Sequence, residues 1–221
     1  KIINEKTPFL IQEAHKNLRT NLSYALAGDT KCKKIIITSS IESEGKSTTV
    51  VNLALVIAQK ASKVLIIDCD LRKPRIHKYL KVRSENVLSS YLSGQSNYES
   101  LIRPTSQENL FIAPAGQKPP NPSELLSSKR MATLIAEAEK QFDYILFDTT
   151  PLEAVSDALV VVPYCEGVVI VTKHRITTHP TLQRTIRKLE FANAKLLGLV
   201  LNGFGSKNAY KYIESAKDMG Y

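Results

Sequence analysis

The sequence lacks long hydrophobic runs: none approaches the roughly 18 to 20 apolar residues that cross a bilayer, and nothing resembles the basic start and apolar middle of a signal peptide. Cysteine is also scarce, because the 221 residues hold only Cys32, Cys69 and Cys165, with no CxxC pair among them. This spacing argues against a disulfide framework and a zinc site, and the four histidines show no metal-ligand pattern either. We therefore expect a cytosolic protein with an ordinary hydrophobic core.

Acidic residues are fewer than basic ones, 21 against 30, which leaves a formal charge of +9. An excess of this sign favours anionic partners such as nucleotides, nucleic acids or acidic lipid surfaces. The densest basic stretch, RKPRIHKYLKVR at 72–83, has no aromatic residue for stacking on bases except Tyr79. We interpret it as a solvated or phosphate-facing edge, and we do not expect nucleic acid as a partner.

A chain of this length fits one domain, over 1–221, since domains commonly run to about 100 to 200 residues. Short β-branched runs alternate with longer amphipathic ones. The runs that predict strands are 34–38, 63–68, 110–114, 143–148, 167–172 and 195–202, and helices are expected at about 11–27, 46–60, 129–141, 155–162 and 178–192. This alternation predicts an α/β fold, a parallel sheet with helices on both faces. The strands are nearly all continuously apolar, as strands covered on both faces must be.

The stretch SSIESEGKST at 39–48 follows the first predicted strand and opens a helix. A strand, a tight loop, Gly-Lys-Ser and a helix make a P-loop, whose backbone amides and helix N-terminus cradle phosphates. Gly45 allows close backbone approach, Lys46 reaches the β- and γ-phosphates and the Ser47 hydroxyl is a candidate Mg²⁺ ligand. Ser40, another small residue, stands where the first glycine of the usual pattern belongs. The predicted fold is therefore P-loop NTPase-like, and the expected nucleotide contacts in the loop are Ser43, Glu44, Gly45, Lys46, Ser47 and Thr48.

Acidic side chains follow two other predicted strands, where parallel sheets place their ligands. Asp68 and Asp70 alternate to one side of the chain after the second strand, and such a pair needs a cation to neutralise it. Asp148 ends the strand YILFD and fits the Walker B role of holding Mg²⁺. Asn202 ends the last strand, in a place suited to hydrogen bonding with a base edge.

These motifs together resemble the bacterial tyrosine kinases of capsule and exopolysaccharide synthesis, of the cytosolic CpsD and CapB type, over nearly the whole chain. SSIESEGKST is similar to the Walker A motif of that family, LIIDCDLR (65–72) to its Walker A′ motif and ILFDTTP (145–151) to its Walker B motif. KPPNPSELL (118–126) is similar to the family's loop before a helix, and EAHKNLRTNL (13–22) to its N-terminal helix.

The resemblance implies a protein-tyrosine kinase that uses ATP and Mg²⁺, autophosphorylates C-terminal tyrosines and regulates capsular or exopolysaccharide synthesis. Its catalytic residues would be Lys46, Asp68 and Asp70, with Asp68 nearest the metal and the base, and its metal ligands would be Ser47, Asp68 and Asp148. Either Asp68 or Asp70 would accept the tyrosine proton. The acceptor tail, about 207–221, would carry Tyr210, Tyr212 and Tyr221, fewer than the dense cluster of the family.

The resemblance also implies partners. The family's EX2RX2R motif supports a ring of protomers, an octamer; here it reads Glu13, Lys16 and Arg19, with lysine in place of the middle arginine. Lysine cannot make the fork contacts of arginine, which weakens the expected ring. A membrane-anchored adaptor of the polysaccharide co-polymerase type would activate the kinase at the inner face of the membrane, and a cognate tyrosine phosphatase would reverse its action.

Two other readings of the same P-loop remain. A positioning ATPase of the MinD and ParA kind would carry a second lysine five positions before Lys46, where this chain has Ile41. A non-catalytic nucleotide-binding assembly module would keep Lys46 and turn over little ATP.

Overall fold

The computed structural model describes residues 2–28, 30–83, 85 and 87–205. These residues form a seven-stranded sheet in the order β3-β4-β2-β5-β1-β6-β7. Within it β3 pairs antiparallel with β4, and the other pairs are parallel. The strands are β1 (Lys33–Ser39), β2 (Val64–Asp68), β3 (Arg103–Pro104), β4 (Leu110–Ala113), β5 (Tyr144–Asp148), β6 (Gly167–Lys173) and β7 (Leu196–Asn202).

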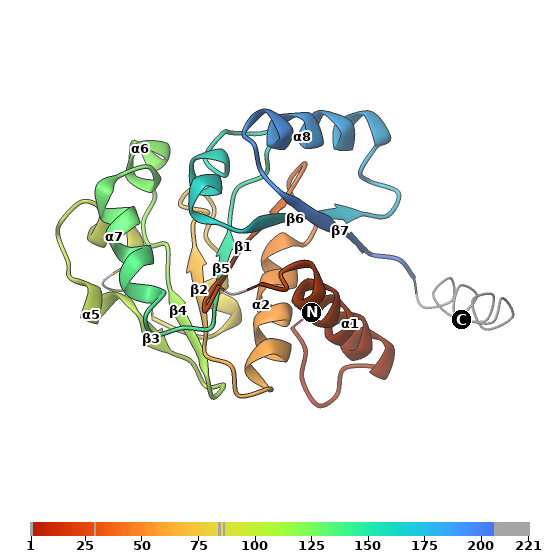
Figure 1. Ribbon diagram of the computed structural model, residues 1–221, viewed down its shortest axis with the longest axis horizontal. Coiled ribbons are helices and arrows are strands. Elements are labelled where there is room, and N and C mark those ends of the chain that lie inside the picture. Colours follow the sequence, from red (N-terminus) through yellow and green to blue (C-terminus); the bar gives the residue numbers. More distant parts are fainter. Residues whose placement is uncertain (1, 29, 84, 86, 206–221) are drawn as a thin grey trace, which may run out of the picture.

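Helices cover both faces of the sheet, which confirms the predicted fold class (Figure 1). One face carries α1 (Phe9–Ala25), α2 (Lys46–Ala58) and α3 (Ile76–Tyr79). The opposite face carries α4 (Leu88–Leu92), α5 (Tyr98–Leu101), α6 (Pro122–Leu126), α7 (Lys129–Ala138), the 3-10 helix η1 (Leu159–Tyr164) and α8 (His179–Phe191).

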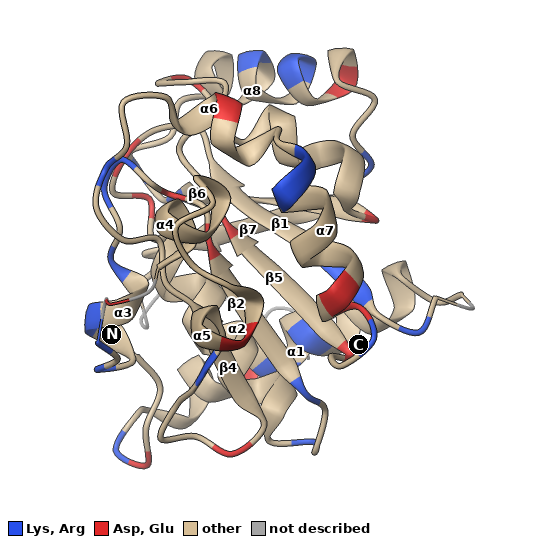
Figure 2. Cartoon of the chain, turned by 90° about the vertical axis from the view of Figure 1, so that its left-hand side faces the viewer, with Lys and Arg blue, Asp and Glu red and all other residues tan. Residues whose placement is uncertain are grey.

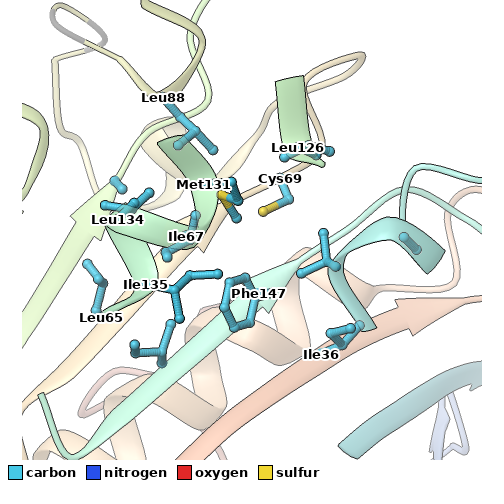
Figure 3. Packing of buried hydrophobic residues seen from close by; sticks show 14 of the residues in the cluster. Ile36, Leu65, Ile67, Cys69, Leu88, Leu126, Met131, Leu134, Ile135 and Phe147 are labelled. Carbon is cyan, nitrogen blue, oxygen red and sulfur yellow. The ribbon is translucent and has the colours of Figure 1, made fainter. Parts of the chain in front are cut away.

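The core is divided by the sheet because side chains alternate along each strand. In β1, Ile35 and Ile37 pack under α2 while Ile36 packs on the opposite side. Phe147 of β5, fully buried, lies among Ile135 and Met131 of α7 on that opposite side (Figure 3). Two apolar layers therefore pack against the central strands, whose carboxyl ends carry the site.

Two expectations about elements were wrong. The helix expected over 155–162 is a turn followed by η1, which contains Pro163, a residue that cannot donate the backbone hydrogen bond of a continuing helix. The last strand is also not covered on both faces. Among the described residues it is an edge strand that pairs only with β6, and Leu199 and Leu201 are 50% and 54% exposed.

The positive charge is distributed over the outside of the molecule. In the view of Figure 2, Lys and Arg colour segments of α3, α7 and α8 and several loops. Among the described residues, no helix combines the length and apolar character needed to span a membrane.

Candidate active site

The P-loop connects β1 to α2 and ends at Gly45, the residue before the first turn of α2. Gly45 has φ 100°, a left-handed conformation that side chains rarely adopt, and a Cβ there would lie 2.0 Å from Nδ2 of Asn202. Conformation and space therefore both require glycine here. Ser40, at the position of the usual first glycine, is buried and its hydroxyl accepts a hydrogen bond from Thr185 of α8 at 2.9 Å.

A cavity of about 160 Å³ opens beside this loop. Of the residues expected to contact nucleotide or to act in catalysis, six line it: Ser43, Gly45, Lys46, Ser47, Thr48 and Asp70. The remaining wall comes from Glu42, Arg72, Lys73, Arg75, Tyr79, Thr150, Pro151, Ala154 and Val155. The structure thus brings the end of β1, the start of α2 and the loops after β2 and β5 around one space.

Glu44 has a different place from the one its position in the loop suggested. It is fully buried, and its carboxylate accepts hydrogen bonds from the backbone N–H of Ile41 at 2.8 Å and from the hydroxyl of Thr177. Since its carboxylate is engaged in holding the loop, any contact of Glu44 with a nucleotide rests on its backbone.

Asn202 also holds the loop. Its Nδ2 donates to the carbonyl oxygen of Glu44 at 2.9 Å, so the end of β7 supports the P-loop from behind. The amide expected to face a base edge is therefore hydrogen-bonded to the protein itself.

Asp68 and Asp148 lie side by side, because β2 and β5 are paired in a register that matches these two residues. Both are fully buried. Burial, reinforced by the charge of Asp148, raises the pKa of Asp68 well above its usual range. Burial likewise raises the pKa of Asp148 to about 6, although the charge of Lys46 and the Ser47 hydroxyl oppose the rise.

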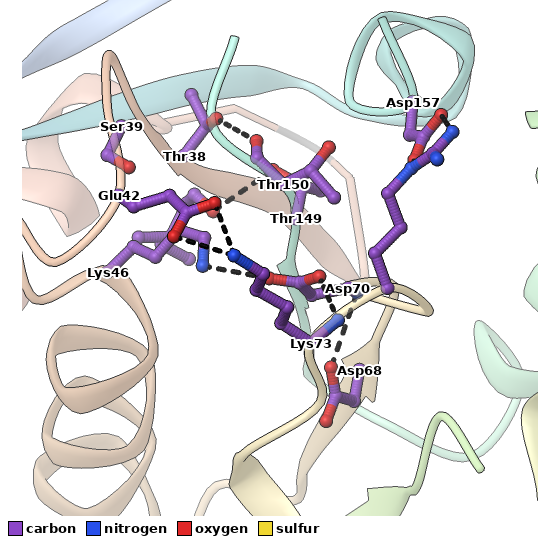
Figure 4. Close-up of polar contacts among 12 residues, drawn as sticks. Thr38, Ser39, Glu42, Lys46, Asp68, Asp70, Lys73, Thr149, Thr150 and Asp157 are labelled. Carbon is purple, nitrogen blue, oxygen red and sulfur yellow. Dashed lines mark hydrogen bonds and ion pairs between the residues drawn. The ribbon is translucent and has the colours of Figure 1, made fainter. Parts of the chain in front are cut away.

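Lys46 supplies the positive charge nearest these carboxylates. Its Nζ lies 3.0 Å from Oδ2 of Asp70 (Figure 4). Burial alone would lower the pKa of Lys46, but the charges of Asp148 and Asp70 outweigh it and raise the pKa. Lys46 is therefore a cation that lines the cavity, and the nearby acids Asp68, Asp70 and Asp148 stabilise its charge.

The carboxylates fit a divalent cation. Both oxygens of Asp148 and one of Asp68 are buried without a hydrogen-bond partner of ordinary geometry among the described residues. Such orphaned acceptors need a counter-charge. The described part of the chain does not bring three His, Cys, Asp or Glu side chains into a ready-made metal cluster. Mg²⁺ suits this arrangement, because it is commonly held by one or two carboxylates together with substrate phosphates.

The predicted assembly residues lie on α1, away from the cavity. Glu13 and Lys16 form an ion pair of 2.7 Å within the helix, and Arg19 donates to the carbonyl oxygen of Val56 in α2 at 2.6 Å. The predicted acceptor tyrosines, Tyr210, Tyr212 and Tyr221, lie outside the described residues.

Sequence reasoning missed two residues that shape the site. The hydroxyl of Thr177, in the loop before α8, donates a hydrogen bond to Glu44. The carboxylate of Asp157 accepts a hydrogen bond from Arg72, which lines the cavity. Neither belongs to a motif that the sequence displays, and both act across long stretches of chain.

The sequence of this chain is similar to those of known proteins. Residues 32–196 match the family model described as an AAA domain. The chain is 39% identical over 194 residues to the tyrosine-protein kinase YwqD of Bacillus subtilis, covering 88% of this chain and 81% of that protein. It is 33% identical over 217 residues to the putative tyrosine-protein kinase CapB of Staphylococcus aureus, covering 98% and 95%.

Solved structures of related proteins have the same fold as this chain. The kinase domain of the Escherichia coli tyrosine kinase ETK superposes with a TM-score of 0.84 at 34% identity, over 92% of this chain and 82% of that one. The septum site-determining protein MinD of Pyrococcus horikoshii, solved with Mg-ADP, scores 0.67 at 26% identity, over 79% and 71%. The sheet, the P-loop and the buried acids, with these likenesses, show that the chain belongs to the bacterial protein-tyrosine kinases, built on a nucleotide-binding P-loop fold.

Proposed function

We propose that the chain transfers the γ-phosphoryl group of ATP to tyrosines of its own C-terminal tail, Tyr210, Tyr212 and Tyr221, and that this regulates capsular or exopolysaccharide synthesis. The observation that carries the proposal is the cavity beside the P-loop, where Lys46 pairs with Asp70 close to the buried carboxylates of Asp68 and Asp148. The names of relatives support the polysaccharide role, among them CapB and a putative tyrosine-protein kinase in the cps region of Klebsiella pneumoniae.

In the proposed step the tyrosine oxygen attacks the γ-phosphorus, the bond from that phosphorus to the β-phosphate oxygen breaks, and ADP leaves. The phenol has a reference pKa of about 10, so its proton must pass to a base. Asp70 lines the cavity and Asp68 does not, which favours Asp70 as that base, the reverse of the sequence-based preference. Lys46 and the amides of the loop bind the phosphate charge.

Ser47, Asp148 and Asp68 would hold Mg²⁺. The ion would neutralise phosphate charge when bound. The orphaned oxygens of Asp148 and Asp68 support this assignment, because Lys46 is the only cation among the described residues that offsets these buried acids in their pKa balance, and a metal ion would add both charge and ligand bonds.

The proposal includes the assembly. Protomers would form a ring, an octamer, through Glu13, Lys16 and Arg19 of α1, and a membrane-anchored adaptor would bring the ring to the inner face of the membrane and activate it. A cognate tyrosine phosphatase would remove the phosphate groups. The tyrosine-protein kinase wzc of Salmonella typhi is a longer relative: this chain matches 28% of its length at 34% identity.

The test is phosphosite mass spectrometry on the purified chain incubated with Mg·ATP, with and without a peptide from the adaptor. We expect phosphotyrosine at Tyr210, Tyr212 or Tyr221, and none in the Lys46→Met variant. Phosphotyrosine on an added tyrosine peptide with none on the tail would contradict autophosphorylation at these sites. ATP hydrolysis without any phosphotyrosine would instead favour a switch of the MinD kind.

A further inference from the structure

Two loops and the short helix α6, distant from one another in the sequence, meet at Asp157. Its carboxylate accepts hydrogen bonds from Nε of Arg72 at 2.6 Å and from Nη2 of Arg72 at 3.1 Å. The hydroxyl of Ser123, in the first turn of α6, donates to the same carboxylate. The side chain of Asp157 is 1% exposed, whereas that of Arg72 is 33% exposed. The buried acid is therefore fixed, and it holds a partner that reaches the surface of the cavity.

Arg72 lines the cavity together with Lys46 and Asp70, but Asp157 does not. The two hydrogen bonds to Asp157 use Nε and Nη2, which form one edge of the planar guanidinium. The Nη1 group has no partner among the described residues. An arginine held along one edge in this way keeps donors on another edge for a phosphate or phosphoryl oxygen.

The charge balance supports a fixed arrangement. Burial would raise the pKa of Asp157, but the hydrogen bonds from Arg72 and Ser123 outweigh it and hold the pKa below its usual range. Asp157 is thus a carboxylate at neutral pH, and its attraction for Arg72 persists through the working range of a cytosolic enzyme.

We propose that Asp157, assisted by Ser123, is a positioning residue that holds the guanidinium of Arg72 at the cavity, where its free edge binds the phosphoryl group during transfer. Asp157 itself touches neither ATP nor tyrosine. Because a kinase of this kind depends on aligned charges in the transition state, a loose Arg72 lowers the rate more than it weakens substrate binding.

The experiment measures kcat and KM for transfer to an added tyrosine peptide, so its outcome is independent of where the tail is phosphorylated. We expect Arg72→Ala, Arg72→Lys and Asp157→Asn each to lower kcat by roughly 10- to 100-fold with a smaller change in KM. Ser123→Ala keeps the ion pair and should lower kcat by less. Arg184→Ala, which removes an exposed arginine paired with Glu153, is the matched control and should leave kcat unchanged.

Chemical rescue distinguishes a role of Asp157 in positioning the guanidinium from a purely structural role in stabilising the loops. Millimolar guanidinium should restore part of the kcat of Arg72→Ala, because the small cation occupies the same place on Asp157. It should not restore the Arg72→Ala and Asp157→Asn double variant. The proposal is overturned if Asp157→Asn melts at a lower temperature with an unchanged kcat, or if rescue is absent or does not depend on Asp157. If Asp157→Asn does not fold, the test rests on Arg72→Lys and on the rescue of Arg72→Ala. In that case a wild-type kcat in Arg72→Lys, or the absence of rescue, overturns the proposal.

Discussion

The buried charge of Asp148 lowers the stability of the folded state. It is fully buried, its oxygens lack hydrogen-bond partners of ordinary geometry among the described residues, and its pKa is raised to about 6. A raised pKa means that the folded protein disfavours the charged form relative to the unfolded chain. At neutral pH the ligand-free enzyme therefore holds a carboxylate that it would be more stable without.

Replacing Asp148 by asparagine should raise stability while it abolishes phosphotransfer. The neutral amide has a similar shape and removes the buried charge, so we expect Asp148→Asn to gain on the order of 1–3 kcal/mol without nucleotide at neutral pH. Thermal melting and a kinase assay on the same preparation check both effects. Asp143→Asn, an exposed change just before β5, is the control. A lower melting temperature for Asp148→Asn than for the wild type would contradict the expectation.

The residues of the site that could be predicted have local signals. Lys46 and Ser47 stand in a Gly-Lys-Ser tripeptide between a strand and a helix, and Asp148 ends an apolar strand. Asp157 and Thr177 could not be found in this way, because their partners lie 85 and 133 residues away in the sequence. Only the folded chain brings those groups together, and no periodicity reports such a contact.

At the level of elements, two polar contacts join α1 to α2 among those described. Arg19 donates to the carbonyl oxygen of Val56 near the end of α2, and the ring of His15 lies 3.4 Å from Nδ2 of Asn52. The predicted assembly arginine thus also has a role inside one protomer, which affects how variants of α1 are interpreted.

We expect Arg19→Ala to destabilise the protomer by about 1–2 kcal/mol, since it removes a charged donor from a backbone carbonyl. Urea unfolding at a concentration where the protein is monomeric measures this loss. Arg187→Ala, an exposed arginine on α8, is the comparison and should change little. Equal stability of Arg19→Ala and the wild type would mean that this hydrogen bond contributes nothing to docking of α1.

His15 should make the same contact sensitive to pH. Burial lowers the pKa of His15 below its ordinary value of 6.5. Between the folded and unfolded pKa values the unfolded chain binds more protons, so this contribution to stability is complete above 6.5 and is lost as pH falls below it. We expect the melting temperature to fall less for His15→Gln than for the wild type between about pH 7.5 and pH 5.5. An identical fall in both proteins would exclude His15 as the cause.

The long elements could be predicted from sequence and the short ones could not. Continuous apolar runs identified β1, β2, β4, β5, β6 and β7, and amphipathic stretches identified α1, α2, α7 and α8. The short helices α3, α4 and α5 have four or five residues each, too few to display a period. The exposure of β7 was missed because an apolar strand at the edge has the same composition as one at the centre.

At the scale of the whole molecule, the proposed ring depends on contacts of α1 with another copy of the chain. Lys16 is paired with Glu13 of its own helix and is 39% exposed, so it is accessible to another protomer. We expect Lys16→Arg to shift the population toward larger assemblies, since arginine makes two directed hydrogen bonds to a carboxylate. Light scattering coupled to size exclusion measures the mass. Lys140→Arg, at an exposed ion pair with Glu137 close after α7, is the control. A mass distribution unchanged by Lys16→Arg would count against Lys16 as an interface residue.

The strand order has a consequence for how the protein is made. A ribosome makes β1, the P-loop and β2 before β5, which follows α7 in the sequence but separates β1 from β2 in the sheet. Asp148 reaches Asp68 only then, and Asn202 reaches the carbonyl of Glu44 only when β7 has been added. The nascent chain thus contains the P-loop sequence long before the contacts that complete the phosphate-binding site can form. We therefore expect nucleotide to stabilise the folding chain only after β7 has been synthesised.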